Sequence, residues 1–161
     1  MRILFIFILS ILILPGCASD VPRKKCDNPD ALQNQEIAKQ YYANNLNKRD
    51  FIKSETGLKY KILKIGNGGI RPGKANEIIA HYEIHRLDGT KIDSSYDRGK
   101  PAIFKLDEVF TGWRMTLEEM VKGEKRVVYL PPEYAFGCKG QLPRIGSNET
   151  LIFTTELVDI K

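Results

Sequence analysis

Alternation of apolar and polar residues over most of the chain after position 57 limits this sequence to folds rich in β-strands. In the segment 78–85, every second residue is apolar: Ile78, Ala80, Tyr82 and Ile84. Successive side chains of a strand point to opposite faces, so this spacing predicts a strand with one buried face. Asp88-Gly89 is a strong hairpin signal and predicts a return through residues 90–93. Further strands are predicted at 58–62, 102–106, 125–130 and 150–160.

One helix is predicted among these strands. Its apolar face has the i, i+3, i+4, i+7 spacing and consists of Trp113, Thr116, Leu117 and Met120. Gly123 suits a C-terminal stop. About five antiparallel strands with one short helix predict an α+β fold, in which a curved sheet wraps around the helix.

A short helix is also predicted ahead of the sheet. Asn28 can cap it, and Pro29 suits its first position. An apolar stripe follows at helical spacing, made of Ala38, Tyr41, Tyr42 and Leu46. The stripe can dock on the main domain or pair with a second copy of the chain, and the sequence leaves both open.

The N-terminus differs from the rest of the chain in carrying a short, almost uninterrupted apolar run. Arg2 precedes an apolar run over residues 3–14 that only Ser10 interrupts. This run is too short to cross a bilayer core, which takes about 20 residues, and it suits the central part of a secretory signal. An uncleaved membrane anchor is the alternative.

Leu14-Pro15-Gly16-Cys17 resembles the bacterial lipobox, in which the cysteine is lipidated and becomes the new N-terminus. Lipidated Cys17 would anchor the chain on the periplasmic side of the envelope. Ala18 and Ser19 follow, in place of the aspartate that signals inner-membrane retention, so the outer membrane is the preferred address. The expected organisation is a signal peptide at 1–16, a lipidated tether with a short helix at 17–53, and the main domain at 54–161.

Charge and motif spacing argue against several other functions. The net charge is +5, and the only basic run, residues 23–25, suits a solvated flank beside a membrane rather than a nucleic-acid site. His81 and His85 would stand about 13 Å apart along a strand, too far to share one metal ion. The segment 66–69 lacks the spacing and the following helix of a phosphate-binding loop. Neither a metal nor a cofactor is therefore expected.

Two cysteines remain in the mature chain. Cys26 and Cys138 lie far apart and lack the Cys-x-x-Cys spacing of zinc and thioredoxin-like sites. In an oxidising periplasm they can form a disulfide with each other. Two unpaired thiols are the alternative, and the sequence does not decide between them.

Five short motifs follow one another in the main domain. They are His81-Tyr82-Glu83, Leu87-Asp88-Gly89-Thr90, Asp93-Ser94-Ser95-Tyr96-Asp97-Arg98-Gly99, Val109-Phe110-Thr111-Gly112-Trp113 and Pro131-Pro132-Glu133-Tyr134-Ala135-Phe136-Gly137. As an ordered set, which runs from about Ser54 to Lys161, they resemble the FKBP-type peptidyl-prolyl cis–trans isomerases. Residues 38–60 resemble the junction between helix and catalytic domain in the macrophage-infectivity-potentiator type.

The resemblance implies a half-barrel sheet around a short helix, with an apolar proline pocket between them. Trp113 would be its floor, and the other substrate-binding residues would be Phe104, Val109, Phe153, Ile92, Phe136 and Ile145. Catalysis would rest on Asp93 at the rim, on Tyr82, and on the main-chain N–H of Phe110. An exposed ion pair between Asp93 and Arg98 is the plain structural alternative at the rim. The implied partners are proline-containing polypeptides, with macrolides as inhibitors.

Several positions depart from the family pattern. Ile92 replaces a pocket phenylalanine, and Phe136 stands where many members have a tyrosine whose hydroxyl bonds the ligand. Ile84 replaces a common glycine, and Arg144 replaces an apolar residue in the loop over the pocket. Two functions therefore stay open. One is an active prolyl isomerase that assists folding of envelope or secreted proteins, and the other is a binding module or chaperone with weak or no catalysis.

Acylation of Cys17, with cleavage after Gly16, is the first testable prediction. Mass spectrometry of the membrane-extracted protein should find a lipid-modified Cys17 at the N-terminus. An intact Met1, or an unmodified Cys17 at the mature N-terminus, would contradict it.

Overall fold

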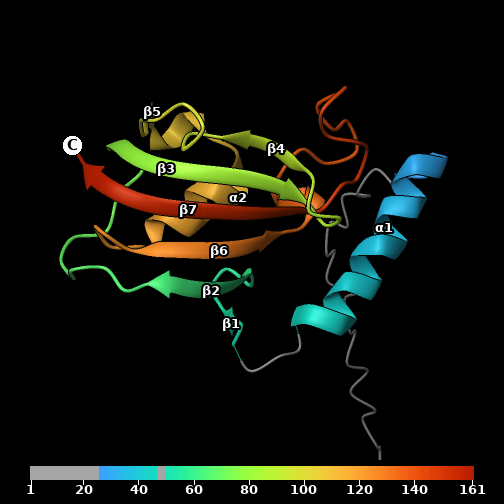
Figure 1. Cartoon of the computed structure of the whole chain (residues 1–161), viewed down its shortest axis with the longest axis horizontal. Coiled ribbons are helices and arrows are strands. Elements are labelled where there is room, and N and C mark those ends of the chain that lie inside the picture. The colour runs from blue at the N-terminus through green and yellow to red at the C-terminus, as the bar shows by residue number, and fades with distance from the viewer. Residues whose placement is uncertain (1–25, 47–49) are drawn as a thin grey trace, which may run out of the picture.

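A single antiparallel sheet of seven strands forms the centre of the computed structural model, which describes residues 26–46 and 50–161 (Figure 1). The strands are β1 (Ile52–Lys53), β2 (Lys59–Lys64), β3 (Glu77–Arg86), β4 (Lys91–Ser94), β5 (Ala102–Lys105), β6 (Lys125–Leu130) and β7 (Leu151–Ile160). Their order is β1-β2-β6-β7-β3-β4, and β5 also pairs with β3. The predicted signal peptide and Cys17 lie outside the described residues. None of the helices in the described ranges is long and apolar enough to cross a membrane.

The sheet has seven strands instead of about five, and β1 alone lies outside the predicted segments. β1 has only two residues, both exposed, so it carries no alternation that a pattern could reveal. β3 is long enough that two short strands share one of its edges. β5 pairs with residues 77–80 of β3, and β4 pairs with residues 83–85. The predicted α+β class, with a helix ahead of the sheet and one short helix against it, is confirmed.

Helix α2 (Thr111–Glu118) lies behind the sheet in the view of Figure 1. It ends two residues earlier than the apolar spacing predicts, so Gly123 is not its C-terminal stop. Gly123 lies in the following turn with φ +82°, and its N–H donates to Leu157 O at 2.7 Å. Gly112 allows the close approach of the helix, because a Cβ there would lie 2.6 Å from Leu130 Cδ2.

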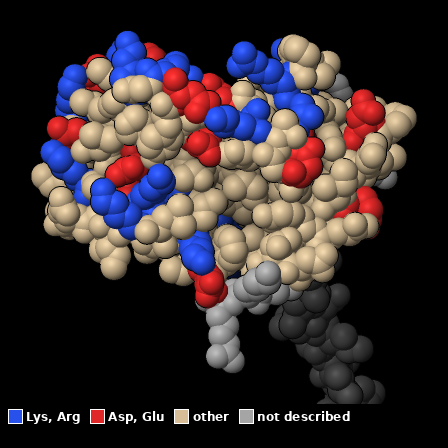
Figure 2. Space-filling model, in the orientation of Figure 1, with Lys and Arg blue, Asp and Glu red and all other residues tan. Residues whose placement is uncertain are grey.

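The hydrophobic core fills the space between α2 and the inner face of the sheet. Its fully buried members come from both layers and include Leu117, Met120, Ile78, Leu130, Phe153 and Leu157. The other side of the sheet carries charged residues of both signs, interspersed with uncharged ones (Figure 2). The position of the core thus fixes which side of each strand can contribute to an apolar site.

Helix α1 (Pro29–Tyr41), continued by one π-helical turn (Tyr42–Leu46), packs beside the sheet. Asn28 caps it as predicted, since its side chain accepts from the Ala31 N–H at 2.9 Å. The apolar stripe docks on β6 of the same chain, where the Tyr41 ring stacks on Tyr129 with centroids 5.9 Å apart.

A disulfide joins Cys26 to Cys138, with the two Cα atoms 5.4 Å apart. The structure therefore favours pairing over two free thiols. Because Cys26 precedes α1 and Cys138 lies in the loop 137–148, the bond ties the start of the helix to that loop. Ser147 strengthens the same junction, since its Oγ accepts from the Asn28 side chain at 2.9 Å.

Replacing both Cys26 and Cys138 with serine should lower the free energy of unfolding. The bond spans a sequence separation of 112 residues, and closing so long a loop removes much of the entropy of the unfolded chain. A loss of about 2–4 kcal/mol is expected, measured by urea unfolding without reductant. The wild type unfolded with reductant should match the double variant. A double variant as stable as the oxidised wild type would contradict the prediction.

Candidate active site

A cluster of aromatic rings lies between α2 and the inner face of the sheet, with Trp113 at its centre. The Trp113 ring centroid is 4.3 Å from that of Phe104, 5.0 Å from Phe153, 5.1 Å from Tyr82 and 5.9 Å from Phe110. Its indole N–H donates to Thr155 Oγ1 at 3.2 Å. Trp113 is only 7% exposed, so packing and this hydrogen bond together fix the orientation of the ring.

Strand register places three of these rings on one face. Tyr82 lies two residues from Ile84 on β3, and Phe153 stands opposite Ile84 on β7. Phe104 stands opposite Ile78, further along the same strand. Residues that pair across an antiparallel ladder share a face. The period of two that buries Ile78 and Ile84 therefore also directs Tyr82, Phe104 and Phe153 toward α2.

Val109 and Phe110 enter the site from the turn that precedes α2. Phe110 is the N-cap of the helix, and its carbonyl accepts from the Trp113 and Arg114 N–H groups at 3.1 and 3.2 Å. The N–H of an N-cap residue comes before the hydrogen-bonded turns of a helix. The Phe110 N–H is thus not used by α2.

Exposure divides the predicted site residues into two groups. Phe153, Ile145 and Trp113 are buried, with exposures of 0%, 1% and 7%. The half-buried residues, which supply the accessible surface, are Tyr82, Ile92, Asp93, Phe104, Val109, Phe110 and Phe136. Ile145 belongs to the core and offers almost no surface to a ligand. Phe136 joins the cluster through Phe110, with ring centroids 5.4 Å apart.

Three polar side chains are bonded to one another at the edge of the cluster. The Tyr82 hydroxyl donates to Asp93 Oδ2 at 2.8 Å. Arg98 donates to Asp93 Oδ1 from Nη1 and to the Tyr82 hydroxyl from Nη2, both at 2.7 Å. Asp93 Oδ1 also accepts from the Ser94 N–H at 2.8 Å. Gly99, at φ +68°, closes the tight turn that brings Arg98 back to the strands.

These contacts set the charge states of the group. Partial burial raises the pKa of Asp93, but hydrogen bonds from Tyr82, Arg98 and the Ser94 N–H lower it more, so the net pKa lies below its usual value. Burial, and then the hydrogen bond to Asp93, raise the pKa of Tyr82. At neutral pH the site therefore holds a carboxylate, a guanidinium and a neutral phenol.

Arg98 is a functional candidate that the sequence predicts only as the partner of Asp93 in an exposed ion pair. An exposed ion pair with Asp93 is part of what the structure shows, with side-chain exposures of 45% and 31%. The added finding is that Arg98 also bonds Tyr82 and lies over its ring, 5.3 Å from the centroid. The sequence signal is the tight turn between Asp93 and Arg98, but nothing in the pattern links that turn to Tyr82.

The histidines have separate surroundings. His81 Nδ1 is 3.0 Å from Ser95 Oγ, and its ring stacks on Tyr96 at 4.3 Å. His85 Nε2 lies 3.3 Å from Glu83 Oε1. In residues 26–46 and 50–161, no three His, Cys, Asp or Glu side chains lie close enough together to hold a metal ion.

Comparison with known proteins identifies the family to which this sequence and fold are similar. Residues 68–158 match the model of the family described as FKBP-type peptidyl-prolyl cis-trans isomerase. The chain is 36% identical over 132 residues to the isomerase FkpA of Escherichia coli K12, covering 82% of this chain and 48% of that one. It is 34% identical over 134 residues to the outer membrane protein MIP of Legionella longbeachae, covering 83% and 57%. The crystal structure of E. coli FkpA superposes with a TM-score of 0.75 at 36% identity, covering 82% of this chain and 61% of that one.

The chain belongs to the FKBP-type peptidyl-prolyl cis–trans isomerase family. The predicted resemblance to that family, including its macrophage-infectivity-potentiator members, is confirmed. The chain spans about half the length of the curated relatives it matches.

Because the pKa of Asp93 is lowered in the folded state, the free energy of unfolding should fall at acid pH. A carboxylate with a folded pKa below its unfolded value, about 3.9, stabilises the fold above that value. The contribution is lost as the pH falls through the folded pKa. Wild type should therefore exceed Asp93→Asn in stability near neutral pH, and the gap should shrink below pH ~4. Urea unfolding from pH 6 to pH 3 measures it, and a gap that stays constant with pH would contradict the prediction.

Proposed function

We propose that this protein catalyses the cis–trans isomerisation of X–Pro bonds in secreted or envelope proteins. The observation that carries the proposal is the fixed aromatic cluster around Trp113, bordered by the bonded Tyr82–Asp93–Arg98 group. Family membership makes a proline ring the expected occupant of the apolar surface.

The chemistry needs no nucleophile. An X–Pro bond rotates over a barrier of about 18–20 kcal/mol, because the amide loses its resonance as it twists. The twisted amide has a less polar carbonyl than the planar one. An apolar surface that excludes water therefore favours the twisted form over the solvated planar form.

Fixed hydrogen-bond donors would add to this effect. The Phe110 N–H, beside the aromatic cluster, is the proposed donor to the substrate main chain. Tyr82 and Asp93 are the proposed rim residues, with Arg98 as a positioning residue that holds both. A thousandfold acceleration requires only about 4 kcal/mol of transition-state stabilisation. Apolar burial with one or two preorganised hydrogen bonds can supply that amount.

Two substitutions favour a second candidate, a binding module or chaperone with weak or no catalysis. Phe136 contributes a ring against Phe110 but has no hydroxyl to bond a ligand. Ile92 presents less apolar surface than the phenylalanine usual in the family. Such a module would hold proline-containing segments, and macrolides are proposed to compete for the same surface in either case.

The protein is proposed to act on the periplasmic side of the envelope, anchored by lipid on Cys17. The lipobox-like tetrad before Cys17 supports the anchor. The residues after Cys17, and a relative that is named an outer membrane protein, support the outer membrane as the address.

Isomerase assays on short X–Pro peptides test the proposal. Asp93→Ala should lower kcat/KM and should cost less stability than a core substitution, because its side chain is partly solvated. Asp97→Ala is the matched control: it removes an exposed carboxylate of the same turn, paired with Lys91 at 2.6 Å. Phe153→Ala should lower both activity and stability, the latter by about 3–5 kcal/mol. Phe136→Tyr should raise activity or macrolide affinity by less than about tenfold, the value of one restored hydrogen bond.

The folded wild type decides between the two candidates. Acceleration above the uncatalysed rate, reduced in Asp93→Ala and kept in Asp97→Ala, supports the enzyme. A folded protein that binds X–Pro peptides without accelerating their isomerisation supports the binding module.

A further inference from the structure

Helix α1 is attached to the domain at its two ends and, between them, through the Ala38 carbonyl, which accepts from the Tyr129 hydroxyl at 3.2 Å. At the N-terminal end, the Asn34 side chain donates to Ser147 O at 2.9 Å, next to the Cys26–Cys138 disulfide. At the C-terminal end, Lys59 Nζ donates to Leu46 O at 2.9 Å. The fully buried side chains of this segment, Ala31 and Leu46, lie at these two ends.

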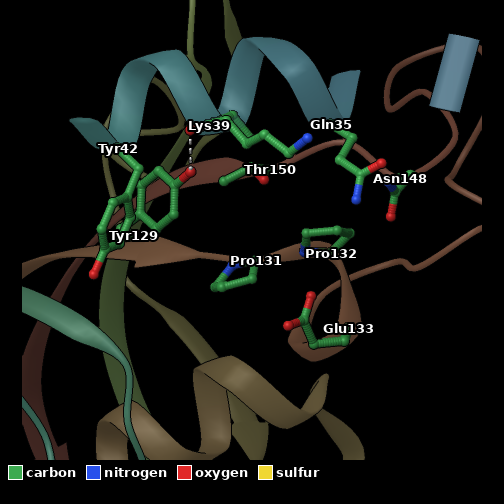
Figure 3. Close-up of a pocket in the computed structure, with 10 residues that line it drawn as sticks. Gln35, Lys39, Tyr42, Tyr129, Pro131, Pro132, Glu133, Asn148 and Thr150 are labelled. Atoms are coloured by element: carbon green, nitrogen blue, oxygen red, sulfur yellow. Dashed lines mark hydrogen bonds between the residues drawn. The ribbon is translucent and has the colours of Figure 1, made fainter. Parts of the chain in front are cut away.

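Between the two attachments, α1 bridges a groove of about 370 Å³ (Figure 3). The helix faces the groove with the short side chain of Ala38, which is too small to fill it. Tyr42 and Tyr129 form one end, and Pro131 and Pro132 form the floor. The groove is thus a gap that the helix spans and does not fill.

The polar groups of the groove complement an extended chain. Gln35 and Lys39 extend from α1 over the opening and provide donors, and Glu133 provides a carboxylate on the opposite side. Polyproline II segments have no internal hydrogen bonds, so their carbonyls need such donors. Grooves lined by aromatic side chains are the usual docking sites for these segments. Glu133 would pair with a basic residue that flanks the prolines.

The size of the groove favours a small occupant. A helix about 10 Å across would fill the volume with less than one turn. A stable pair of folded chains buries more than about 1,000 Å², so the groove would form only part of such an interface. Two or three residues of an extended chain are the occupant that fits.

One short segment of the chain leads from the groove to the proposed isomerase site. Pro131 and Pro132 form its floor, and the chain then makes a 3₁₀ turn (Pro132–Tyr134) and reaches Phe136. Phe136 packs on Phe110 in the aromatic cluster. A polypeptide held in the groove would therefore keep its neighbouring residues at high effective concentration near Trp113.

We propose that this groove binds short, extended, proline-containing segments of client polypeptides, as a second site beside the isomerase site. Such binding needs no catalysis, so it stands or falls independently of the proposed activity.

An NMR titration of the purified, ¹⁵N-labelled protein tests the proposal. The probe is a capped decapeptide of three Ala-Pro-Pro repeats followed by arginine, and its control has Gly-Ser in place of each Pro-Pro. The proline peptide should shift the amide signals of Gln35, Asn148 and Thr150, and the control peptide should not. Tyr42→Ala should weaken this binding about tenfold, as truncation of an aromatic anchor does. Gln40→Ala, on the exposed side of α1, is the matched control and should bind like the wild type.

A second variant removes the objection that Tyr42→Ala loosens the helix. Ala38→Leu should fill the groove and abolish the shifts without loss of thermal stability, and signals near Trp113 should still respond to the peptide. Equal shifts with the two peptides, shifts confined to the surroundings of Trp113, or unchanged binding by both variants would overturn the proposal. Groove signals that move with protein concentration alone would assign the groove to a second copy and overturn it too.

Discussion

Packing of α2 against the inner face of the sheet is the contact on which the rest of the structure depends. Gly112 makes it possible, because any larger residue there would collide with Leu130. The contact buries Leu117 completely and leaves Trp113 slightly exposed. The aromatic surface proposed to bind proline is therefore the outer rim of the hydrophobic core. Residues such as Phe153 serve the fold and the site together, so they cannot change for one purpose alone.

The bonded Tyr82–Asp93–Arg98 group at the rim limits how much water the charged side chains hold beside the apolar surface. An apolar surface binds a proline ring best when no unpaired charge nearby keeps water in place. Asp93 is charged at neutral pH, but Arg98 and Tyr82 already occupy both of its oxygens. The rim thus keeps a defined electrostatic field with little need for solvent. A buried ion pair would cost more to desolvate, and partial exposure of both partners avoids that cost.

Much of the fold could be predicted because half-buried strands show apolar and polar residues in alternation. The predicted segment 125–130 coincides with β6, and the predicted segment 150–160 exceeds β7 by one residue. Contacts between distant segments could not be predicted. The Arg98–Tyr82 bond joins residues 16 apart across a turn, and alternation carries no information on which side chains meet. Thr155 alternates with the buried residues Phe153 and Leu157 on one face of β7. A polar residue at such a position indicates a buried hydrogen-bond partner, here the Trp113 indole.

The Cys26–Cys138 bond has a mechanical consequence. If the chain is tethered through residues before Cys26, tension on the tether reaches the disulfide before it reaches α1. The force passes directly into the loop after Phe136 and bypasses the helix, its connection to the sheet and the two-residue strand β1. These elements would thereby be shielded from strain. The loop after Phe136 would then be the point through which such a tether holds the domain.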